Sequence, residues 1–358
     1  MKILCVIDSL GSGGAQRQLV NLAIAFKNRG HAVEFLVYHR QPFFYRVVED
    51  SQIPIHEVIE RSYFKRLVRM RTVIRSGDFD TVLSFLEAAS FISTVSGFPY
   101  RRWRLVVGER SSNPAILTSF KLRFYRFFHL FVDVVVANSR ENLRLVKKAN
   151  PFISKKKLKV IYNLIDLDAW RLYPEKYKYS SGGKFNLVVV ASHQYLKNLI
   201  GLVEAVNLLD RDEQARLIVN WYGGLRSDNS KSEAEKKINQ YQIGSVFSFH
   251  EPTIDIVEEV SRADALGLFS FYEGFPNVVC EAMANAKPVI ASDVSDISIF
   301  IGEKFVFDPK DMYQMRDAIR LLLSMSPGEL VEIGKVNESV AVSSFSEDKI
   351  VKSYLSLM

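Results

Sequence analysis

The stretch Glu273-Gly-Phe-Pro-Asn-Val-Val-Cys-Glu281 places two carboxylates eight residues apart, one in a Gly/Pro turn and one in an apolar run. The preceding residues, 265–271, are predicted to form a buried strand, and residues 276–285 a short helix that begins at Pro276. Glu273 then lies at the carboxyl end of a strand, where open α/β sheets bind small ligands. Two carboxylates beside a helix amino terminus suit a ligand with hydroxyl groups and a diphosphate, such as a nucleotide-sugar.

A simpler interpretation of the same stretch is a solvated loop acid followed by an acid on a helix surface. Glu281, however, lies within the apolar run Val278-Val-Cys-Glu-Ala-Met283, which predicts a largely buried helix. A carboxylate in such a helix needs a partner or a ligand. This favours a binding site over a solvated surface.

Strands alternate with helices along both halves of the chain. A strand at 2–7, a glycine-rich turn at 9–14, a helix at 15–29 and a strand at 32–38 predict one right-handed βαβ unit. The other predicted strands are 81–85, 104–107, 132–137 and 160–162, then 185–191, 217–222, 246–250, 265–271 and 288–291; helices are predicted at 199–209 and 254–262. The predicted fold class is α/β, with two doubly wound domains and a cleft between them.

The length of 358 residues is too great for one ordinary core. Residues 172–184 are rich in Tyr, Lys, Ser and Gly and lack an apolar period, so we predict a linker there. The predicted domains are residues 1–171 and 184–345, followed by a last helix within 346–358.

The net charge of +7 is unevenly distributed. Residues 1–160 contain 27 Lys and Arg against 12 Asp and Glu, or +15, and the remaining residues contain 20 against 28, or −8. Only one domain is therefore expected to face an anionic partner. Both cysteines, Cys5 and Cys280, stand in apolar runs, which predicts buried thiols in a reducing compartment. The apolar runs are too short for a signal peptide or a membrane span, so we expect a cytoplasmic protein or one attached to a membrane face.

In each half of the chain, one further motif follows the first predicted strand. The turn Ser9-Leu-Gly-Ser-Gly-Gly14 lets a backbone approach a phosphate at a helix amino terminus, although its spacing is not that of the dinucleotide fingerprint. Lys197, within Ser192-His-Gln-Tyr-Leu-Lys-Asn198, provides a cation for a diphosphate. The alternatives are a tight turn with no ligand and a lysine at a solvated helix start.

Together these motifs resemble the family 4 retaining glycosyltransferases of the GT-B fold. The resemblance covers nearly the whole chain in the right order and is strongest over residues 245–295. It rests on Gly13-Gly14-Ala15, Asn138-Ser139, Ile161-Tyr-Asn-Leu-Ile-Asp166, Lys197-Asn198, Glu273-Gly-Phe-Pro-Asn277, Glu281-Ala-Met-Ala284 and Lys287-Pro-Val-Ile-Ala-Ser-Asp293.

The resemblance implies an acceptor-binding first domain, a nucleotide-sugar-binding second domain and a last helix that returns to the first. It assigns Glu281 to the ribose hydroxyls, Glu273 to the sugar hydroxyls and Lys197 to the leaving diphosphate. The implied catalytic residues are Glu273, Lys197 and Glu109. The implied donor-binding residues are Gly13, Gly14, Ser192, Lys197, Gly274, Phe275, Pro276, Asn277 and Glu281.

Two positions depart from the family pattern. Ser192 stands where the family usually has an arginine, so charge stabilisation is expected from Lys197 and the helix dipole, or from Arg17 or Arg110. The family often has a histidine after the fourth strand, where this chain has Gly108-Glu109-Arg110. We interpret Glu109 and Arg110 as a cleft pair in that place.

The expected reaction moves a sugar from a nucleoside diphosphate, a UDP-sugar rather than a GDP-sugar, to a hydroxyl group with retention of configuration. Fixed cations and N–H donors aimed at the departing diphosphate are expected to be the largest catalytic contribution. We do not assign Glu273 as a nucleophile, because same-face attack by the acceptor is the family's usual mechanism. No D-x-D motif stands in a loop, so neither a metal nor a cofactor is predicted.

Two basic amphipathic stretches in the first half predict contact with an anionic membrane surface or a lipid-linked or lipopolysaccharide acceptor. Apolar residues recur at helical spacing within 61–75 and 120–131, with cations between them. The alternative is ordinary helices with solvated basic backs. The predicted acceptor or membrane residues are Arg66, Arg69, Lys121, Arg123 and Arg126.

Other functions remain open at this point. A GT-B-fold epimerase would convert the donor without an acceptor, and a non-catalytic homologue would bind it only. The chain lacks the glycine fingerprint of a Rossmann dehydrogenase, which argues against that function. The chain also lacks a helix-turn-helix or single-strand-binding signature, so no nucleic acid partner is expected.

Overall fold

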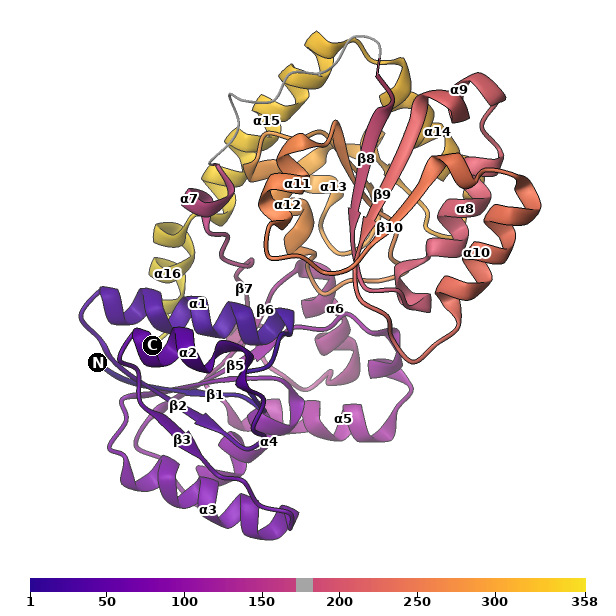
Figure 1. Ribbon diagram of the computed structural model, residues 1–358. Coiled ribbons are helices and arrows are strands. Elements are labelled where there is room, and N and C mark those ends of the chain that lie inside the picture. Colours follow the sequence, from indigo (N-terminus) through magenta and orange to yellow (C-terminus); the bar gives the residue numbers. More distant parts are fainter. Residues whose placement is uncertain (172–182) are drawn as a thin grey trace. The chain divides into compact units, whose positions relative to one another are not determined.

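The computed structural model describes residues 1–171 and 183–358 and divides the chain into two compact units. Unit 1 comprises residues 1–164 and 347–358, and unit 2 comprises residues 165–346. Each unit is a parallel sheet with helices on its faces (Figure 1). Most of the predicted linker, 172–182, lies outside the described residues. The α/β class predicted from the sequence is confirmed.

The sheet of unit 1 has seven parallel strands in the order β3-β2-β1-β4-β5-β6-β7. The strands are β1 (Lys2–Val6), β2 (Ala32–Val37), β3 (Ile55–Glu57), β4 (Thr81–Phe85), β5 (Arg104–Glu109), β6 (Val134–Ala137) and β7 (Leu158–Val160). The helices are α1 (Gly14–Asn28), α2 (Tyr45–Asp50), α3 (Tyr63–Ser76), α4 (Glu87–Ser96), α5 (Phe120–Phe127), α6 (Arg140–Ala149) and α16 (Glu347–Leu355).

Apolar side chains point alternately to the two faces of the sheet of unit 1 and form one core on each face. Ile3 and Cys5 of β1 pack with the apolar side of α1 and with Tyr354 of α16. Leu4 and Val6 pack on the other face with residues of α3, α4 and α6. Because successive strand side chains point to opposite faces, a continuous apolar strand requires helices on both faces.

The sheet of unit 2 has six parallel strands in the order β10-β9-β8-β11-β12-β13. The strands are β8 (Phe185–Val190), β9 (Leu217–Tyr222), β10 (Phe247–His250), β11 (Ala265–Leu268), β12 (Val289–Ser292) and β13 (Val306–Phe307). The helices are α7 (Leu167–Trp170), α8 (Leu199–Asn207), α9 (Arg211–Arg216), α10 (Ser230–Tyr241), α11 (Ile256–Arg262), α12 (Asn277–Ala284), α13 (Ser298–Ile301), α14 (Met312–Ser324) and α15 (Pro327–Phe345).

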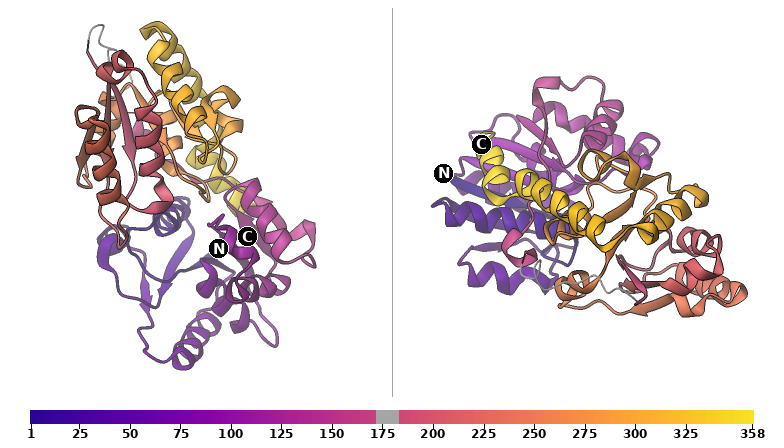
Figure 2. Two further views of the ribbon diagram at one scale, coloured as in Figure 1. Left: turned by 90° about the vertical axis from the view of Figure 1, so that its right-hand side faces the viewer. Right: turned by 90° about the horizontal axis from the view of Figure 1, so that it is seen from above.

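Polar contacts hold the helices α16 and α7 in place within their units. In unit 1, Arg29 forms an ion pair with Glu347 at 2.6 Å, which holds α16 beside α1. In unit 2, Asn285 donates a hydrogen bond to the Trp170 carbonyl at 2.7 Å, which holds α7 against the end of α12. Figure 2 shows α15 and α16 in sequence at the yellow end of the chain. Among the helices of residues 1–171 and 183–358, none combines the length and the apolar composition of a membrane span.

Candidate functional site

The strand order of unit 2 reverses between β8 and β11, which pair directly. The loop after β8 carries Ser192 and Lys197, and the loop after β11 carries Glu273. Open parallel sheets bind ligands outside the carboxyl ends of their strands at such a switch point. The fold therefore brings three of the predicted donor-site residues to the position where this architecture places a ligand.

Lys197 and Glu273 form the charged centre of this position. The Lys197 Nζ donates to Glu273 Oε1 at 2.5 Å, and both side chains are less than one-fifth exposed. The Phe271 N–H donates to the Leu196 carbonyl at 2.9 Å, so the two loops are joined directly beside the pair. A backbone contact of this kind preorganises the cation and the carboxylate.

The turn after Glu273 leads into α12, which begins at Asn277, one residue later than expected. The Gly274 carbonyl accepts a hydrogen bond from Ser295 Oγ at 2.8 Å, and the ring of Phe275 is buried against Phe300 and Phe345. No side chain caps the helix at Pro276, and the first turn of α12 has no acidic residue. The amino end of α12 therefore suits an anionic ligand group.

Glu281 lies in the buried part of α12 and is 7% exposed. Burial, together with the negative charge of Glu281, raises the pKa of the neighbouring Cys280 thiol well above its ordinary value. Cys280 is therefore an inert, protonated core residue. Both cysteines are buried free thiols, as the sequence predicted.

Sequence reasoning missed Asn198 as a structural residue of this site. Its backbone is left-handed, with φ of 56°, and its side chain caps α8 by accepting from the Gly201 N–H at 3.2 Å. Its amide also donates to the Pro309 carbonyl at 2.8 Å. The sequence signal for this role is an asparagine immediately before an apolar helical run, which is typical of a helix N-cap.

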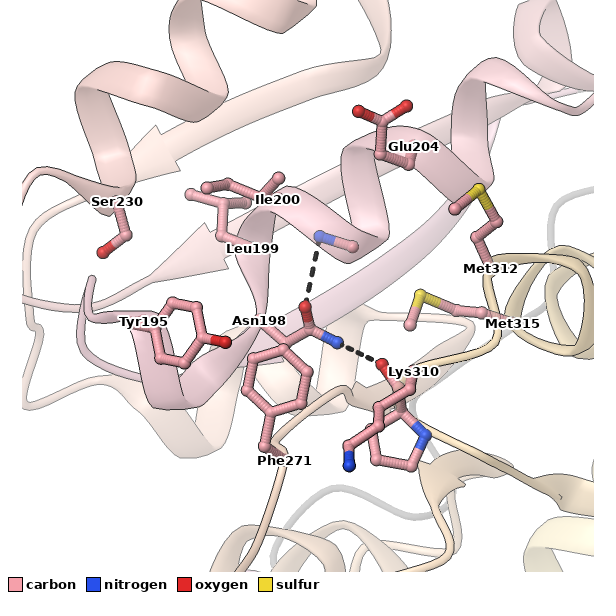
Figure 3. Close-up of a pocket in the computed structure, with 12 residues that line it drawn as sticks. Tyr195, Asn198, Leu199, Ile200, Glu204, Ser230, Phe271, Lys310, Met312 and Met315 are labelled. Atoms are coloured by element: carbon pink, nitrogen blue, oxygen red, sulfur yellow. Dashed lines mark hydrogen bonds between the residues drawn. The ribbon is translucent and has the colours of Figure 1, made fainter.

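A cavity of about 300 Å³ is lined in part by residues of the two loops that carry the Lys197–Glu273 pair, although neither member of the pair lines it (Figure 3). Tyr195 and Phe271, each two residues before one member of that pair, stand at its edge with their ring centroids 5.0 Å apart. The remaining wall is largely apolar and includes residues of α8 and α14. The Ser192 hydroxyl, in the same loop, accepts from the Gln194 amide at 3.0 Å.

Lys287, in one of the motifs that carry the family resemblance, has a structural role. Its Nζ donates to the carbonyls of Ser261 and Ala263 at 2.6 and 3.0 Å, at the end of α11. A lysine here satisfies carbonyls that the helix leaves unpaired. Burial lowers the pKa of Lys287 to about 7, although the nearby Asp264 carboxylate partly opposes this.

The glycine turn of unit 1 lies at the corresponding switch point of the first sheet, where β1 pairs with β4. Gly13 has an extended backbone and α1 begins at Gly14. Asp8, which ends this strand region, accepts from the Ser9 N–H at 2.7 Å and the Gln16 amide at 2.9 Å. These bonds hold the turn in place beside the α1 amino end, which has no acidic residue in its first turn.

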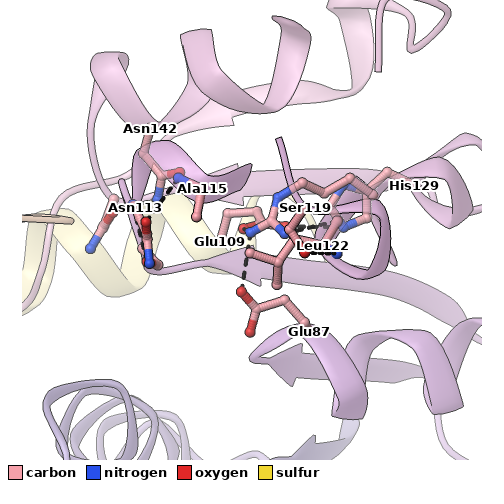
Figure 4. A network of polar contacts seen from close by, with 11 residues as sticks. Glu87, Glu109, Asn113, Ala115, Ser119, Leu122, His129 and Asn142 are labelled. Carbon is pink, nitrogen blue, oxygen red and sulfur yellow. Dashed lines mark hydrogen bonds and ion pairs between the residues drawn. The ribbon is translucent and has the colours of Figure 1, made fainter. Parts of the chain in front are cut away.

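Glu109 ends β5 and belongs to a buried network (Figure 4). Its carboxylate lies 2.7 Å from Nη2 of Arg126, which also contacts Glu87 at 3.2 Å. Burial alone would lower the pKa of Arg126, but the charges of Glu109 and Glu87 outweigh it and raise that pKa. The Nε2 of His129 lies 3.3 Å from Glu109, and burial and the Arg126 charge lower the His129 pKa to about 3, so this histidine is neutral.

The interpretation of Glu109 and Arg110 as a pair is wrong. Arg110 donates to Asn163 Oδ1 at 3.0 Å and to the Tyr354 hydroxyl, and its guanidinium lies 3.8 Å from the centroid of the Phe85 ring. Glu109 instead contacts Arg126 and His129. Adjacent residues at the end of a strand point to opposite faces, which separates these two side chains.

The five predicted acceptor or membrane cations lie in different environments. Arg69, Lys121 and Arg123 are exposed, and Arg69 also pairs with Glu60. Arg66 is half-buried over the ring of Tyr38. Arg126 is fully buried, so its assignment to a membrane surface is wrong: it is held inside unit 1 by Glu87 and Glu109.

Two buried histidines predict a loss of stability in mild acid. The pKa of His129 is lowered to about 3 and that of His193, by burial and the Lys231 charge, to about 4, from an ordinary 6.5. Between pH 6.5 and 4.5 the unfolded chain therefore binds protons that the folded chain does not, and unfolding free energy falls by about 1.4 kcal/mol per pH unit for each histidine.

Urea denaturation at pH 7.5, 6.5, 5.5 and 4.5 measures this loss. Glu213, whose pKa the Arg320 hydrogen bond lowers from 4.5 to about 2, adds to the loss only at the acid end of this range, below about pH 5.5. His193→Asn is expected to reduce the pH dependence of the unfolding of unit 2. An unchanged dependence in that variant would contradict the assignment.

Two family models together match most of the chain. The model described as "Glycosyltransferase Family 4" matches residues 12–169, and that described as "Glycosyl transferases group 1" matches residues 175–336. The first falls almost entirely in unit 1, extending five residues into unit 2, and the second covers most of unit 2, including the Lys197–Glu273 pair.

Two curated relatives are named as glycosyltransferases. The chain is 26% identical over 79% of its length, and 77% of the relative, to a Campylobacter jejuni alpha-1,4-N-acetyl-D-galactosaminyltransferase named for a diphospho-undecaprenol-linked saccharide. It is 23% identical, over 82% of its length and 80% of the relative, to a second C. jejuni N-acetylgalactosaminyltransferase named for a related saccharide.

Solved structures establish the fold. The Anabaena protein Alr3699/HepE in complex with UDP has a TM-score of 0.85 at 17% identity, with 99% of both chains covered. The lipopolysaccharide outer core galactosyltransferase WaaB has a TM-score of 0.78 at 14% identity, with 100% of this chain and 99% of that chain covered. With its two halves matched by the two family models and its fold by these structures, the chain belongs to the family 4 glycosyltransferases with the GT-B fold.

Proposed function

We propose that this glycosyltransferase moves one sugar from a nucleoside diphosphate-sugar to a hydroxyl group of a lipid-linked or polysaccharide acceptor. The transfer retains the anomeric configuration and requires no metal. The observation that carries the proposal is the Lys197–Glu273 pair at the β8/β11 switch point beside the uncapped amino end of α12.

The chemistry follows from the charges of this position. As the bond from the anomeric carbon to the diphosphate breaks, negative charge grows on the departing oxygens. The Lys197 ammonium and the N–H groups at the α12 amino end stabilise that charge. Glu273 orients the sugar hydroxyls, and Glu281 binds the ribose hydroxyls. The acceptor hydroxyl oxygen forms its bond on the face that the diphosphate leaves, and its proton passes to an oxygen of the departing diphosphate.

Relatives guide the choice of substrates. Structures of Alr3699/HepE contain UDP or UDP-glucose, which supports a UDP-sugar rather than a GDP-sugar as donor. The two C. jejuni relatives are named for diphospho-undecaprenol saccharides, which supports a lipid-linked acceptor. With such an acceptor, we propose that the enzyme is a peripheral protein on the inner face of the cell membrane, with its basic unit 1 toward anionic lipid.

A donor panel with lipid-linked acceptors tests the proposal. We expect one nucleotide-sugar to be consumed only when acceptor is present, in a reaction that persists in EDTA. Proton NMR of the product is expected to show the same anomeric configuration as the donor. Conversion of the donor to an isomer without acceptor would indicate an epimerase instead, and inversion or loss of activity in EDTA would overturn the corresponding part of the proposal.

A further inference from the structure

Helix α5 of unit 1 exposes its aromatic face and buries one of its two arginines. Phe120 is 85% exposed, and Phe124 and Phe127 are 44% and 49% exposed, whereas Arg126 is fully buried. A surface helix of a globular protein normally has the opposite arrangement, with apolar residues facing the core. The outward face of α5 therefore has a composition that the fold of unit 1 does not require.

The exposed rings continue beyond α5 as one surface. Phe131 contacts Phe127 and Phe98, with ring centroids 6.2 and 5.2 Å apart, and both Phe131 and Phe98 are about two-fifths exposed. Phe152, which follows α6, is 83% exposed and lines a groove of about 380 Å³ with residues of α5. We call this set the aromatic surface: Phe98, Phe120, Phe124, Phe127, Phe131 and Phe152.

Cations outnumber acids next to the aromatic surface. Residues 110–132 and 142–165, which include five of its six members, contain eleven Lys and Arg and no Asp or Glu, and the nearby Asp133 is paired with Arg101. Lys121, Arg123, Lys148, Lys155 and Lys156 among them are exposed. Protruding aromatic rings surrounded by cations match the two layers of a membrane surface, an acyl boundary beneath anionic headgroups.

We propose that the aromatic surface inserts its phenylalanine rings into the interface of a phospholipid bilayer while the neighbouring cations contact the headgroups. This inference deepens the membrane location of the proposed function but does not depend on sugar transfer. It also changes the expected behaviour: purely electrostatic docking is lost in high salt, whereas inserted rings leave a salt-resistant component.

Vesicle sedimentation separates the two contributions. We expect the protein to bind phosphatidylcholine/phosphatidylglycerol vesicles, and to retain measurable binding at about 1 M salt, where the screening length is only about 3 Å. The double variant Phe120→Ala/Phe152→Ala is expected to lower the high-salt partition coefficient at least ten-fold. Its two side chains are so exposed that the substitutions are expected to leave the fold intact.

Two controls define the specificity of this loss. Ile254→Ala removes a side chain that is 96% exposed in unit 2 and is expected to leave binding unchanged. Lys121→Ala/Arg123→Ala is expected to weaken binding at low salt only. Equal high-salt binding by the wild type and the phenylalanine variant, or complete loss of wild-type binding in salt, would overturn the inference.

A fluorescent label reports insertion directly. Because Cys5 and Cys280 are both buried, a cysteine introduced by Phe152→Cys is the accessible thiol for an environment-sensitive dye. We expect its emission to shift to shorter wavelength when vesicles are added. An unshifted spectrum would show that residue 152 stays in water and would overturn insertion. A dimer in light scattering that disappears in Phe120→Ala/Phe152→Ala would also overturn it, and would identify a second copy of the chain as the partner of the aromatic surface.

The test is independent of the proposed transferase activity. Donor consumption with a water-soluble acceptor measures catalysis without vesicles, and the phenylalanine variant is expected to retain it. Loss of vesicle binding with intact transfer would overturn insertion alone, whereas vesicle binding by an inactive protein would overturn the proposed function alone.

Discussion

Replacing Lys197 by alanine is expected to lower kcat/KM for sugar transfer about 100- to 1,000-fold, the usual loss when one preorganised group that stabilises transition-state charge is removed. The reason is the position of its Nζ, 2.5 Å from Glu273 at the switch point of the second sheet. The effect is expected mainly in kcat, because charge on the diphosphate develops as the bond breaks. Steady-state kinetics with the donor identified by screening measures it.

Lys237 provides a matched control for this prediction. It also belongs to unit 2, and its Nζ lies 2.5 Å from the carboxylate of Glu204 on the wall of the 300 Å³ cavity, which neither Lys197 nor Glu273 lines, so Lys237→Ala breaks a similar pair outside the proposed diphosphate site. That variant is expected to keep its kcat. Glu273→Gln, which keeps the side-chain shape, is expected to lose activity as well. If Lys197→Ala and Glu273→Gln both retained more than about one-tenth of wild-type kcat/KM, the site assignment would fail.

Replacing Arg126 by methionine is expected to lower the free energy of unfolding of unit 1 by about 3–5 kcal/mol, the cost of removing one partner from a buried ion pair. Arg126 has no exposed surface, and Glu109 and Glu87 both depend on it for charge compensation. Urea denaturation at pH 7.5 measures the loss. Arg123→Ala, on the exposed side of the same helix, is expected to change stability by less than about 0.5 kcal/mol.

Glu109→Gln separates the structural and catalytic roles of this carboxylate. The buried contacts predict that the variant loses stability, because Arg126 then keeps only Glu87 as a charged partner. A catalytic role predicts in addition a lower kcat for protein that is shown to be folded at the assay temperature. Comparable destabilisation with unchanged kcat would assign Glu109 to positioning. A variant of wild-type stability would contradict the ion-pair argument itself.

Much of the architecture follows from local sequence. Apolar runs of strand length predicted β4 at 81–85 and β9 at 217–222 with the bounds that the structure has. Glycine and proline marked the turns before α1 and α12. The short strands β3 and β13 were not predicted, because two or three residues are too few to show a period.

The buried face of helix α5 could not be predicted from local sequence. Its phenylalanine stripe and its cations define two faces, but periodicity does not say which face meets the protein. The side of α5 that carries Arg126 meets Glu87 of α4 and Glu109 of β5, and these come from distant parts of the chain. Burial of the arginine, and with it exposure of the phenylalanines, depends on that long-range pairing.

The parallel α/β class, the glutamate motif and the loops that carry Lys197 and Glu273 could be predicted from local sequence, because they depend on short-range spacing and on residue chemistry. Which of those side chains meet depends on the packing of the whole sheet. The order of the strands makes β8 and β11 neighbours, and that adjacency brings Lys197 to Glu273 across 76 positions of chain. Strand order is a property of the whole sheet, so no local pattern specifies it.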